Sequence, residues 1–516
     1  MIHMRWSRLF TVCANLALCL ALALSFASGG LAGQGEAEEA ENEVLYLPLA
    51  MKNRIPFIES TGELDASFDG DGWALANING GNETATGVAL QPDGKIVVVG
   101  TDMTAYSYDF VVARYNPDSS LDATFSGDGI VVTDFSSNDD WARAVTIQPD
   151  GKIIAVGGTI TPGGFALARY HPDGSLDNSF GIGGKVVTIF DTAGLVSYDE
   201  AFSIVLQPDG KILVAGSGSY LCTGCESTLV LARYLPDGSL DNSFIVDGLL
   251  ESNVTLGYSI HYAILLQPDG KIVAVTSAQG TSEDIAVVRF DADGSLDKGF
   301  GQAGVVTTDW GCNENPAGVV LQPNGKIIAA GTVWCNLNTA YILARYNPDG
   351  SLDTGFDGDG MLVTDIDGGD DYGQAIALQL DGKIVVAGYT YGTTSDFALA
   401  RYNPDGSLDT SFNGDGMLVT DFAGADDFAY AVALQPNGKI VVAGCAKGAT
   451  IDFALARYHP DGSLDTTFAS VGKLVTDYLG SYDYGQAIAL LPDGKIIVAG
   501  YASNGVDADF ALVRYK

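Results

Sequence analysis

The sequence predicts an all-β protein folded as a β-propeller, with eight four-stranded blades as the most direct solution. Three short strings carry this prediction, because each occurs eight times and always in the same order. They are SLDxxF, QPDGK or a near copy of it, and ALARY or a variant. Successive copies lie 55 to 60 residues apart, with the lysine of the second string at Lys95, Lys152, Lys211, Lys271, Lys326, Lys383, Lys439 and Lys495.

Each repeat contains four segments with the composition of β-strands. In the seventh repeat they are residues 416–422, 430–435, 439–444 and 452–458, which are β-branched and apolar or alternate in polarity. Gly, Pro and Asp separate these segments, as is typical of strands joined by turns. The repeats show no sustained apolar period of 3.6 residues, so we expect strands rather than helices.

The QPDGK string predicts a tight antiparallel hairpin. Pro436 presets the backbone for the first central position of a type I turn, and Asn437 tolerates the second. Gly438 suits the left-handed position of the bulge that completes such a turn. The strands before and after this string should therefore pair with each other.

The segment 402–416 is too long for a hairpin and too regular for a slack loop. We expect it to cross from the outer edge of one blade to the inner edge of the next. The first repeat begins at Glu63 and the last ends at Lys516, so the two ends complement each other and a closed ring leaves no exposed edge. An open solenoid and a seven-bladed ring with one displaced unit are the alternatives.

Residues 1–27 are predicted to be a signal peptide, which implies a secreted or cell-surface protein. Arg5 and Arg8 precede an apolar stretch over residues 9–26, and small residues follow it, so cleavage is expected after Ala27. An uncleaved membrane anchor is the alternative, since this stretch lies at the short end of a spanning helix. Residues 28–57 are predicted to be an acidic and apolar linker, and residues 58–516 a single propeller.

The strings PDGSLDxxF, QPDGKIVVAG and FALARY resemble the delta-60 repeat family, a group of bacterial secreted repeat proteins. The resemblance covers residues 62–516. It implies a β-propeller fold and an exported location, but no known activity. The chain departs from the pattern locally, because the fourth repeat reads DADGSLDKGF and Leu380 replaces the turn proline of the sixth.

The charge balance excludes some classes of partner. The chain has 64 acidic and 26 basic residues among 516, and its formal net charge is −38. A nucleic-acid partner is not expected, because binding phosphates requires a basic surface. Docking on anionic lipid is disfavoured, because it also requires a basic surface. Separately, we expect the protein to be a monomer. The hydrophobic content of 47% excludes a disordered chain.

Several cysteines can form disulfides, which an exported chain is free to do. We expect Cys312 and Cys335 to follow the first and third strands of the fifth repeat on one face, where flexible loops could join them. Cys222 and Cys225 could close a small loop, and Cys445 is then left as a free thiol. Histidines fall in different repeats, so neither a serine protease triad nor a histidine zinc site is supported.

The link between repeats carries an Asx-x-Asp-Gly-x-x-Asp pattern that resembles the first half of a calcium loop. The Glu that would complete such a loop is missing, and the same residues suit ordinary turns. No cofactor is expected other than Ca²⁺. The candidate ligands are Asp291, Asp293, Asp297, Asp349, Asp353, Asp405 and Asp409.

The arginine of ALARY and the lysine of PDGK recur in every repeat, as do the aspartates of SLD and PDG. Residues that recur in every repeat are usually architectural. We therefore interpret them as an ion-pair or hydrogen-bond lattice that fixes the link to its sheet.

A second acidic pattern is predicted on the opposite face, where the loop before the second strand often combines an acid with an aromatic residue. Because loops of variable length on a rigid scaffold often bind ligands, this face is the candidate site for a glycan or a basic protein patch. The alternative is that the aromatic rings cover blade edges and the acids are solvated. The candidates are Asp140, Trp141, Asp199, Asp371, Tyr372, Asp427, Phe428, Asp483 and Tyr484.

These observations favour a secreted or cell-surface binding scaffold, because no catalytic constellation is recognisable. The alternative is an extracellular enzyme, a carbohydrate-active hydrolase or lyase with a carboxylate site in a central pocket. A third option is a purely structural component of the envelope, which sequence cannot separate from a scaffold.

Overall fold

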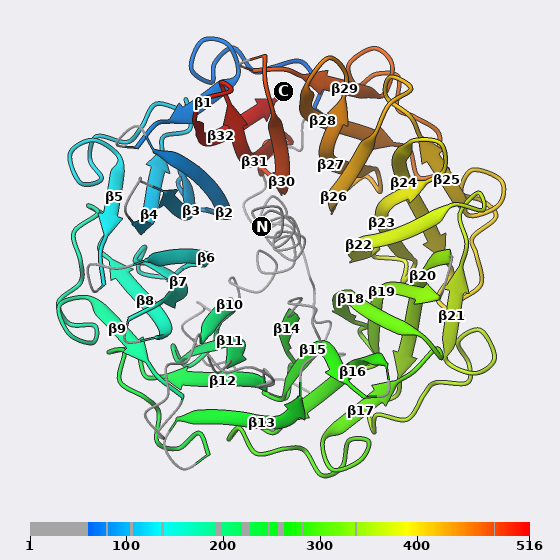
Figure 1. Ribbon diagram of the computed structural model, residues 1–516, viewed down its shortest axis with the longest axis horizontal. Coiled ribbons are helices and arrows are strands. Elements are labelled where there is room, and N and C mark those ends of the chain that lie inside the picture. Colours follow the sequence, from blue (N-terminus) through cyan, green and yellow to red (C-terminus); the bar gives the residue numbers. More distant parts are fainter. Residues whose placement is uncertain are drawn as a thin grey trace, which may run out of the picture.

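A computed structural model describes residues 60–78, 81–103, 107–135, 139–161, 163–190, 199–218, 228–245, 248–255, 263–280, 282–335, 338–478 and 480–516. The signal peptide and linker predicted for residues 1–57 lie outside this part. The described chain is all-β, and its 32 strands form eight four-stranded blades around one axis (Figure 1). The eight-bladed ring is thus confirmed over the seven-bladed alternative. Among the described residues, no helix is long and apolar enough to span a membrane.

The strands run in chain order from the inner to the outer edge of each blade. Blades 1 and 2 contain β2 (Asn82–Leu90), β3 (Ile96–Met103), β4 (Tyr108–Tyr115), β5 (Ile130–Thr133), β6 (Asp140–Ile147), β7 (Ile153–Thr159), β8 (Gly164–Tyr170) and β9 (Lys185–Thr188). Blades 3 and 4 contain β10 (Glu200–Leu206), β11 (Ile212–Gly218), β12 (Thr228–Tyr234), β13 (Leu249–Thr255), β14 (Ala263–Leu266), β15 (Ile272–Gln279), β16 (Glu283–Phe290) and β17 (Val305–Thr308).

The second half of the ring follows the same plan. Blades 5 and 6 contain β18 (Asn313–Leu321), β19 (Ile327–Cys335), β20 (Asn338–Tyr346), β21 (Met361–Thr364), β22 (Asp370–Leu378), β23 (Ile384–Tyr391), β24 (Ser395–Tyr402) and β25 (Met417–Thr420). Blades 7 and 8 contain β26 (Asp427–Leu434), β27 (Ile440–Lys447), β28 (Ile451–Tyr458), β29 (Lys473–Thr476), β30 (Asp483–Leu490), β31 (Ile496–Ser503), β32 (Ala508–Tyr515) and β1 (Trp73–Ala76).

The ring closes by pairing the two ends of the propeller. The outermost strand of blade 8 is β1, which pairs antiparallel with β32 from Trp73↔Val513 to Ala76↔Phe510. Figure 1 shows β1 beside β32, β31 and β30, so the start of the ring completes the blade made by its end. Closure hides the strand edges that an open array would expose, as the complementary ends of the repeats predicted.

The predicted blade boundary is wrong. Residues 402–416 do not cross between blades but connect β24 to β25 within blade 6, where β25 pairs with β24 from Phe397↔Thr420 to Ala400↔Met417. The segment folds back on the strand it leaves, because the Asp409 amide donates to the Arg401 carbonyl at 2.9 Å and Leu408 bridges to Tyr402. The crossover to the next blade is the shorter segment 421–426.

In seven of the eight blades the inner strand carries a bulge that a repeated glycine accommodates. In blade 7 the register between β26 and β27 shifts between Ala429 and Ala431, and the same shift recurs in six other blades. A Cβ on Gly444 would lie 1.9 Å from the Phe428 carbonyl oxygen, so the backbones approach too closely for any side chain there. The hairpin turn is as predicted, with Gly438 at a φ of +83°.

A buried ion pair holds each link to its own blade. In blade 7 the Arg457 guanidinium lies 2.7 Å from Asp465 of the link and 4.6 Å above the Phe468 ring, and Lys439 lies 2.8 Å from the same carboxylate. Burial alone would raise the pKa of Asp465, but hydrogen bonds from Lys439 and Thr467 and the charge of Arg457 hold it well below its usual range. The equivalent arginine and aspartate pair in every blade, which supports the predicted lattice.

Replacing Arg457 by Met should destabilise the propeller strongly, because it removes the partner of a carboxylate that is fully buried. We expect a loss of about 3 kcal/mol or more in the free energy of unfolding, measured by urea denaturation. Lys447→Met is the matched control, since Lys447 forms an exposed ion pair with Asp426 at 3.1 Å that contributes less than about 1 kcal/mol. Equal losses in the two variants would contradict a structural role for the buried pair.

Candidate functional site

A carboxylate at the start of an inner strand, or just before it, caps the crossover that arrives from the previous blade. Seven junctions have such a carboxylate. The Asp427 Oδ2 accepts a hydrogen bond from the Phe422 amide at 2.7 Å, and the Asp371 Oδ2 accepts one from the Ile366 amide at 2.6 Å. The same contact recurs at other junctions through Glu83, Asp140, Asp199, Glu314 and Asp483. These carboxylates therefore fix how each outer strand turns into the next blade.

The five aspartates proposed for the binding face are buried, which corrects the expectation that they lie on an exposed surface. Asp140, Asp371, Asp427 and Asp483 have no exposed area and Asp199 only 2%. Burial raises the pKa of Asp371 and Asp427 to about 7 and that of Asp483 to about 6, and neighbouring aspartates add to the effect. A direct contact between these five acids and a large partner would require the crossovers to open.

The aromatic residues that follow three of these acids are half-buried and come together on neighbouring inner strands. Tyr372 on β22 stacks on Tyr389 with 4.8 Å between ring centroids, and Tyr389 meets Phe428 on β26 edge-on at 5.0 Å. Tyr484 on β30 stacks on Tyr501 at 5.0 Å. We call Tyr372, Tyr389, Phe428, Tyr430, Tyr484 and Tyr501 the aromatic cluster; Figure 1 shows β22, β26 and β30 next to one another at the ring axis.

Tyr430 lies parallel to Phe428 with 6.5 Å between ring centroids, and the Cys445 thiol lies 3.9 Å from its hydroxyl. Tyr430 occupies the bulge of β26, and Gln374 and Gln486 occupy the corresponding bulges of β22 and β30. Bulges redirect side chains and are frequent beside functional sites. The cluster therefore offers half-buried rings interspersed with two carboxamides.

Trp141, the fourth aromatic candidate, lies apart from the aromatic cluster. Its indole N–H donates to the Glu200 carboxylate, which also pairs with Arg143. Both β6 and β10 lie across the ring from β26 in Figure 1. The structure thus brings together three of the four predicted aromatic residues and gives the fourth a charged partner.

The predicted calcium ligands are used by ion pairs and turns. Asp297, Asp353 and Asp409 each bind the arginine and the lysine of their own blade, and Asp291 pairs with Lys271. The remaining three candidates accept hydrogen bonds from the serine two residues later, at 2.6 to 2.7 Å; they are Asp293, Asp349 and Asp405. Cations of the protein already neutralise the buried members, which favours the turn interpretation of this segment over the calcium interpretation.

Clusters of three acids that the sequence reasoning missed lie at three crossovers instead. In each, carboxylate oxygens of three residues lie within 4.8 Å of one another. The three triads are Asp284, Asp309 and Glu314; Asp396, Asp421 and Asp427; and Asp452, Asp477 and Asp483. A signal was present in the sequence, because an acid precedes the strand of the ALARY string in these repeats and another follows the outer strand. The acidic clusters can hold a metal ion.

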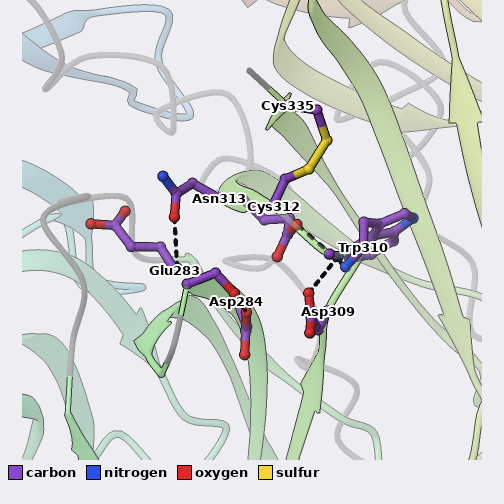
Figure 2. The surroundings of a disulfide bond; sticks show 10 residues. Glu283, Asp284, Asp309, Trp310, Cys312, Asn313 and Cys335 are labelled. Atoms are coloured by element: carbon purple, nitrogen blue, oxygen red, sulfur yellow. Dashed lines mark hydrogen bonds between the residues drawn. A yellow bond between two sulfur atoms is a disulfide. The ribbon is translucent and has the colours of Figure 1, made fainter.

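Cys312 and Cys335 form a disulfide (Figure 2). Cys312 directly precedes β18 and Cys335 ends β19, which are adjacent strands, so their Cα atoms lie 5.2 Å apart rather than two strand spacings. The corrected blade boundary is the reason for the difference. Cys445 is free and buried, and burial raises the pKa of its thiol to about 12. Cys222 and Cys225 lie outside the described residues.

A family profile described as "Domain of unknown function (DUF5122) beta-propeller" matches the chain eight times. The matched segments are residues 91–125, 148–180, 207–244, 267–300, 322–356, 379–412, 435–468 and 491–516. The match covers the repeats that carry the three strings and agrees with the repeat class inferred from them. A search of curated proteins found no match.

Several solved structures are similar to this chain at low identity. Sqt1 of Chaetomium thermophilum, bound to the N-terminus of a ribosomal protein, is 11% identical over 86% of this chain and 98% of its own, with a TM-score of 0.49. An inactive virginiamycin B lyase of Staphylococcus aureus is 12% identical over 74% of this chain and 95% of its own, with a TM-score of 0.37. The polysaccharide lyase Uly1 is 14% identical over 72% of this chain and 88% of its own, with a TM-score of 0.39. Likeness at this level carries no argument about function.

The raised pKa of Asp371 predicts a pH-dependent cost to the fold. The folded chain keeps this proton up to about pH 7, whereas an unfolded Asp loses it near pH 4. Stability therefore falls as the pH rises from about 4 to 7. In Asp371→Asn the amide oxygen can still accept from Ile366, and we expect the variant to gain stability relative to wild type over this range, on the order of 2 kcal/mol by pH 8. Denaturation curves in EDTA at pH 4.5, 6 and 8 measure it.

The control for this experiment is Asp359→Asn, which removes an exposed carboxylate that does not act on Asp371 and keeps the acceptor for the Met361 amide. Its curve should run parallel to that of the wild type. Parallel curves for Asp371→Asn as well would show that the buried carboxyl ionises in the folded chain as it does in the unfolded one.

Removing the disulfide should destabilise blade 5 without abolishing the ring, because β18 and β19 remain paired along their length. Closing a loop of 23 residues is worth about 3 kcal/mol in the chain-entropy model. We expect the double variant Cys312→Ala and Cys335→Ala to melt at a lower temperature than the oxidised wild type. Reduced wild type should match the variant, and a melting temperature insensitive to reductant would contradict the assignment.

Proposed function

The chain belongs to the DUF5122 β-propeller family, and on that premise we propose that it is an exported binding scaffold whose ligand site is the aromatic cluster. The observation that carries this proposal is the gathering of six aromatic side chains on the inner strands of blades 6 to 8 and the strands next to them. Rings that stack on each other while remaining half-exposed present flat apolar faces with polar rims, which suit a ligand that is apolar on one face and polar on the other.

A neutral glycan is the ligand class that this surface fits best. A sugar ring offers C–H groups to an aromatic face and hydroxyls to the tyrosine hydroxyls and to the carboxamides of Gln374 and Gln486. Gln486 has a buried Oε1 without a hydrogen-bond partner, which a sugar hydroxyl could occupy. An anionic glycan fits less well, because the net charge of −38 repels it.

Export to an oxidising compartment is the second part of the proposal. It rests on the N-terminal segment, which has the charge and hydropathy of a signal peptide. The Cys312–Cys335 disulfide supports it, because such bonds persist outside the cytosol. The delta-60 resemblance implies the same location.

Replacing Tyr372, Phe428 and Tyr484 together by Ala should weaken glycan binding strongly, because each ring face contributes about 0.5 to 1.5 kcal/mol. Affinity electrophoresis through gels with a soluble neutral β-glucan, a galactomannan or alginate measures it. We expect retardation by at least one neutral polymer and none by alginate, and a loss of about tenfold or more in affinity for the triple variant.

Tyr482→Ala is the control for this variant, since Tyr482 is 55% exposed and lies outside the aromatic cluster. It should bind as the wild type does. Circular dichroism and melting temperature establish that the triple variant keeps the propeller. Binding that survives in a folded triple variant would overturn the proposed site.

A further inference from the structure

The three acidic triads share one construction. In the triad at the junction of blades 7 and 8, Asp452 lies near the start of β28, Asp477 directly follows β29, and Asp483 opens β30. Three consecutive segments of the chain thus bring their carboxylates within 4.8 Å at the point where one blade passes into the next. Figure 2 shows two members of the equivalent triad of blades 4 and 5, Asp284 and Asp309, beside the disulfide.

The carboxylates of the triads form no ion pair with the cations that the structure describes. Among the described residues, none of their nine carboxylates forms an ion pair with Lys or Arg within 4.0 Å. Lys473 approaches the Asp396 triad, but its ammonium bonds the Asp421 carbonyl. Burial raises the pKa of Asp452 and Asp483, and the neighbouring carboxylate of Asp477 raises both further. Close carboxylates without a counter-ion are unfavourable unless a proton or a cation joins them.

Each triad also contains a buried acceptor that the protein leaves unused. Asp483 is fully buried, and while its Oδ2 accepts from the Tyr478 amide, its Oδ1 has no hydrogen-bond partner. The same holds for Asp427 Oδ1 and for Glu314 Oε2, in side chains that are 0% and 1% exposed. A buried acceptor without a donor is costly. Asp371 Oδ1 is also unpartnered at the junction of blades 5 and 6, so the triads differ from that junction in having a third acid beside this oxygen.

We propose that each of the three triads binds one Ca²⁺ ion, which ties the outer strands of one blade to the inner strand of the next. Ligand sets made only of oxygen select hard cations. Oxygens within 4.8 Å of one another can share one such ion. The flexible coordination of Ca²⁺ accepts carboxylates from three separate segments more readily than the octahedral coordination of Mg²⁺ does. Backbone carbonyls and water complete the six to eight ligands of Ca²⁺. This inference does not depend on the proposed glycan site.

Other junctions of the same ring serve as comparisons. Between blades 8 and 1 the middle acid is replaced by Asn77, whose amide donates to Asp509 at 2.7 Å, so a hydrogen bond fills the space there. Between blades 5 and 6 the first acid is replaced by Ala340, which leaves Asp365 and Asp371 only. The ring therefore tolerates neutral residues at these places, and the full triads are not required by the fold.

The test is a titration of the full chain, freed of metal by chelation, with Ca²⁺ alone in 0.15 M NaCl. Equilibrium dialysis and calorimetry should give three bound ions per chain. Asp477→Asn keeps the acceptor for the Gly480 amide and should bind two ions, or bind the third at least tenfold more weakly. Asp365→Asn is the matched control, because Asp365 makes the same contact with Gly368 but belongs to no full triad; it should still bind three.

Failure to bind Ca²⁺, or the same stoichiometry and affinity in both variants, would overturn the proposal. Equal affinity for Mg²⁺ would overturn the assignment to calcium. Asp477 is exposed, so its variant should fold, and Asp452→Ala gives an independent check because it copies the Ala340 that the ring already carries. A change in glycan retardation without a change in Ca²⁺ stoichiometry would bear on the aromatic cluster alone.

Discussion

This propeller depends on one buried ion pair in each blade. It joins the arginine near the end of the third strand to the aspartate of the link that follows. It makes the link fold back on its own blade, so that the fourth strand pairs with the third. The same guanidinium reaches a carbonyl of the next blade in most of the ring, as Arg401 does with Pro460. One side chain therefore sets the order of strands inside a blade and the spacing between blades, which explains why it recurs in every repeat.

A ring built from such similar units can place a function only where the units differ. The residue after the capping carboxylate is the clearest case, because it is polar at Thr84, Glu200 and Asn315 and aromatic at Tyr372, Phe428 and Tyr484. The capping acid before it is buried in each of these six units. The architecture thus keeps one side chain for the crossover and leaves the next one free to vary. Three of the four aromatic variants are consecutive around the ring, and Trp141 of blade 2 is the exception.

Much of the fold could be predicted from the sequence, because repeat spacing, turn chemistry and complementary ends all report on local or repeated structure. The blade boundary could not, since segment 402–416 has the length of a crossover and only the pairing of Asp409 with Arg401 reveals that it turns back. The candidate site was found in part. The sequence placed Asp427 and Phe428 in a loop before the strand, whereas they open β26, where Asp427 is buried and Phe428 is half-buried. The ion pairs of the calcium candidates could not be predicted, because their lysine and arginine partners come from other strands.

The acids of the repeats fall into two groups, one beside the hairpin turns and one beside the crossovers between blades. This division determines the electrostatics of the crossovers. On the hairpin side, aspartates are matched with lysine and arginine in each blade, and most of the basic residues of the chain are used there. The excess of acid over base must therefore lie elsewhere, and part of it is concentrated at the crossovers, where blades are joined by short segments. Repulsion there acts against the junctions themselves. Lys447 pairs with Asp426 at one crossover and Lys473 bonds the Asp421 carbonyl there, but neither pairs with a triad carboxylate. A bound cation would relieve this repulsion, and the stability of the ring would then depend on the ionic composition of the medium.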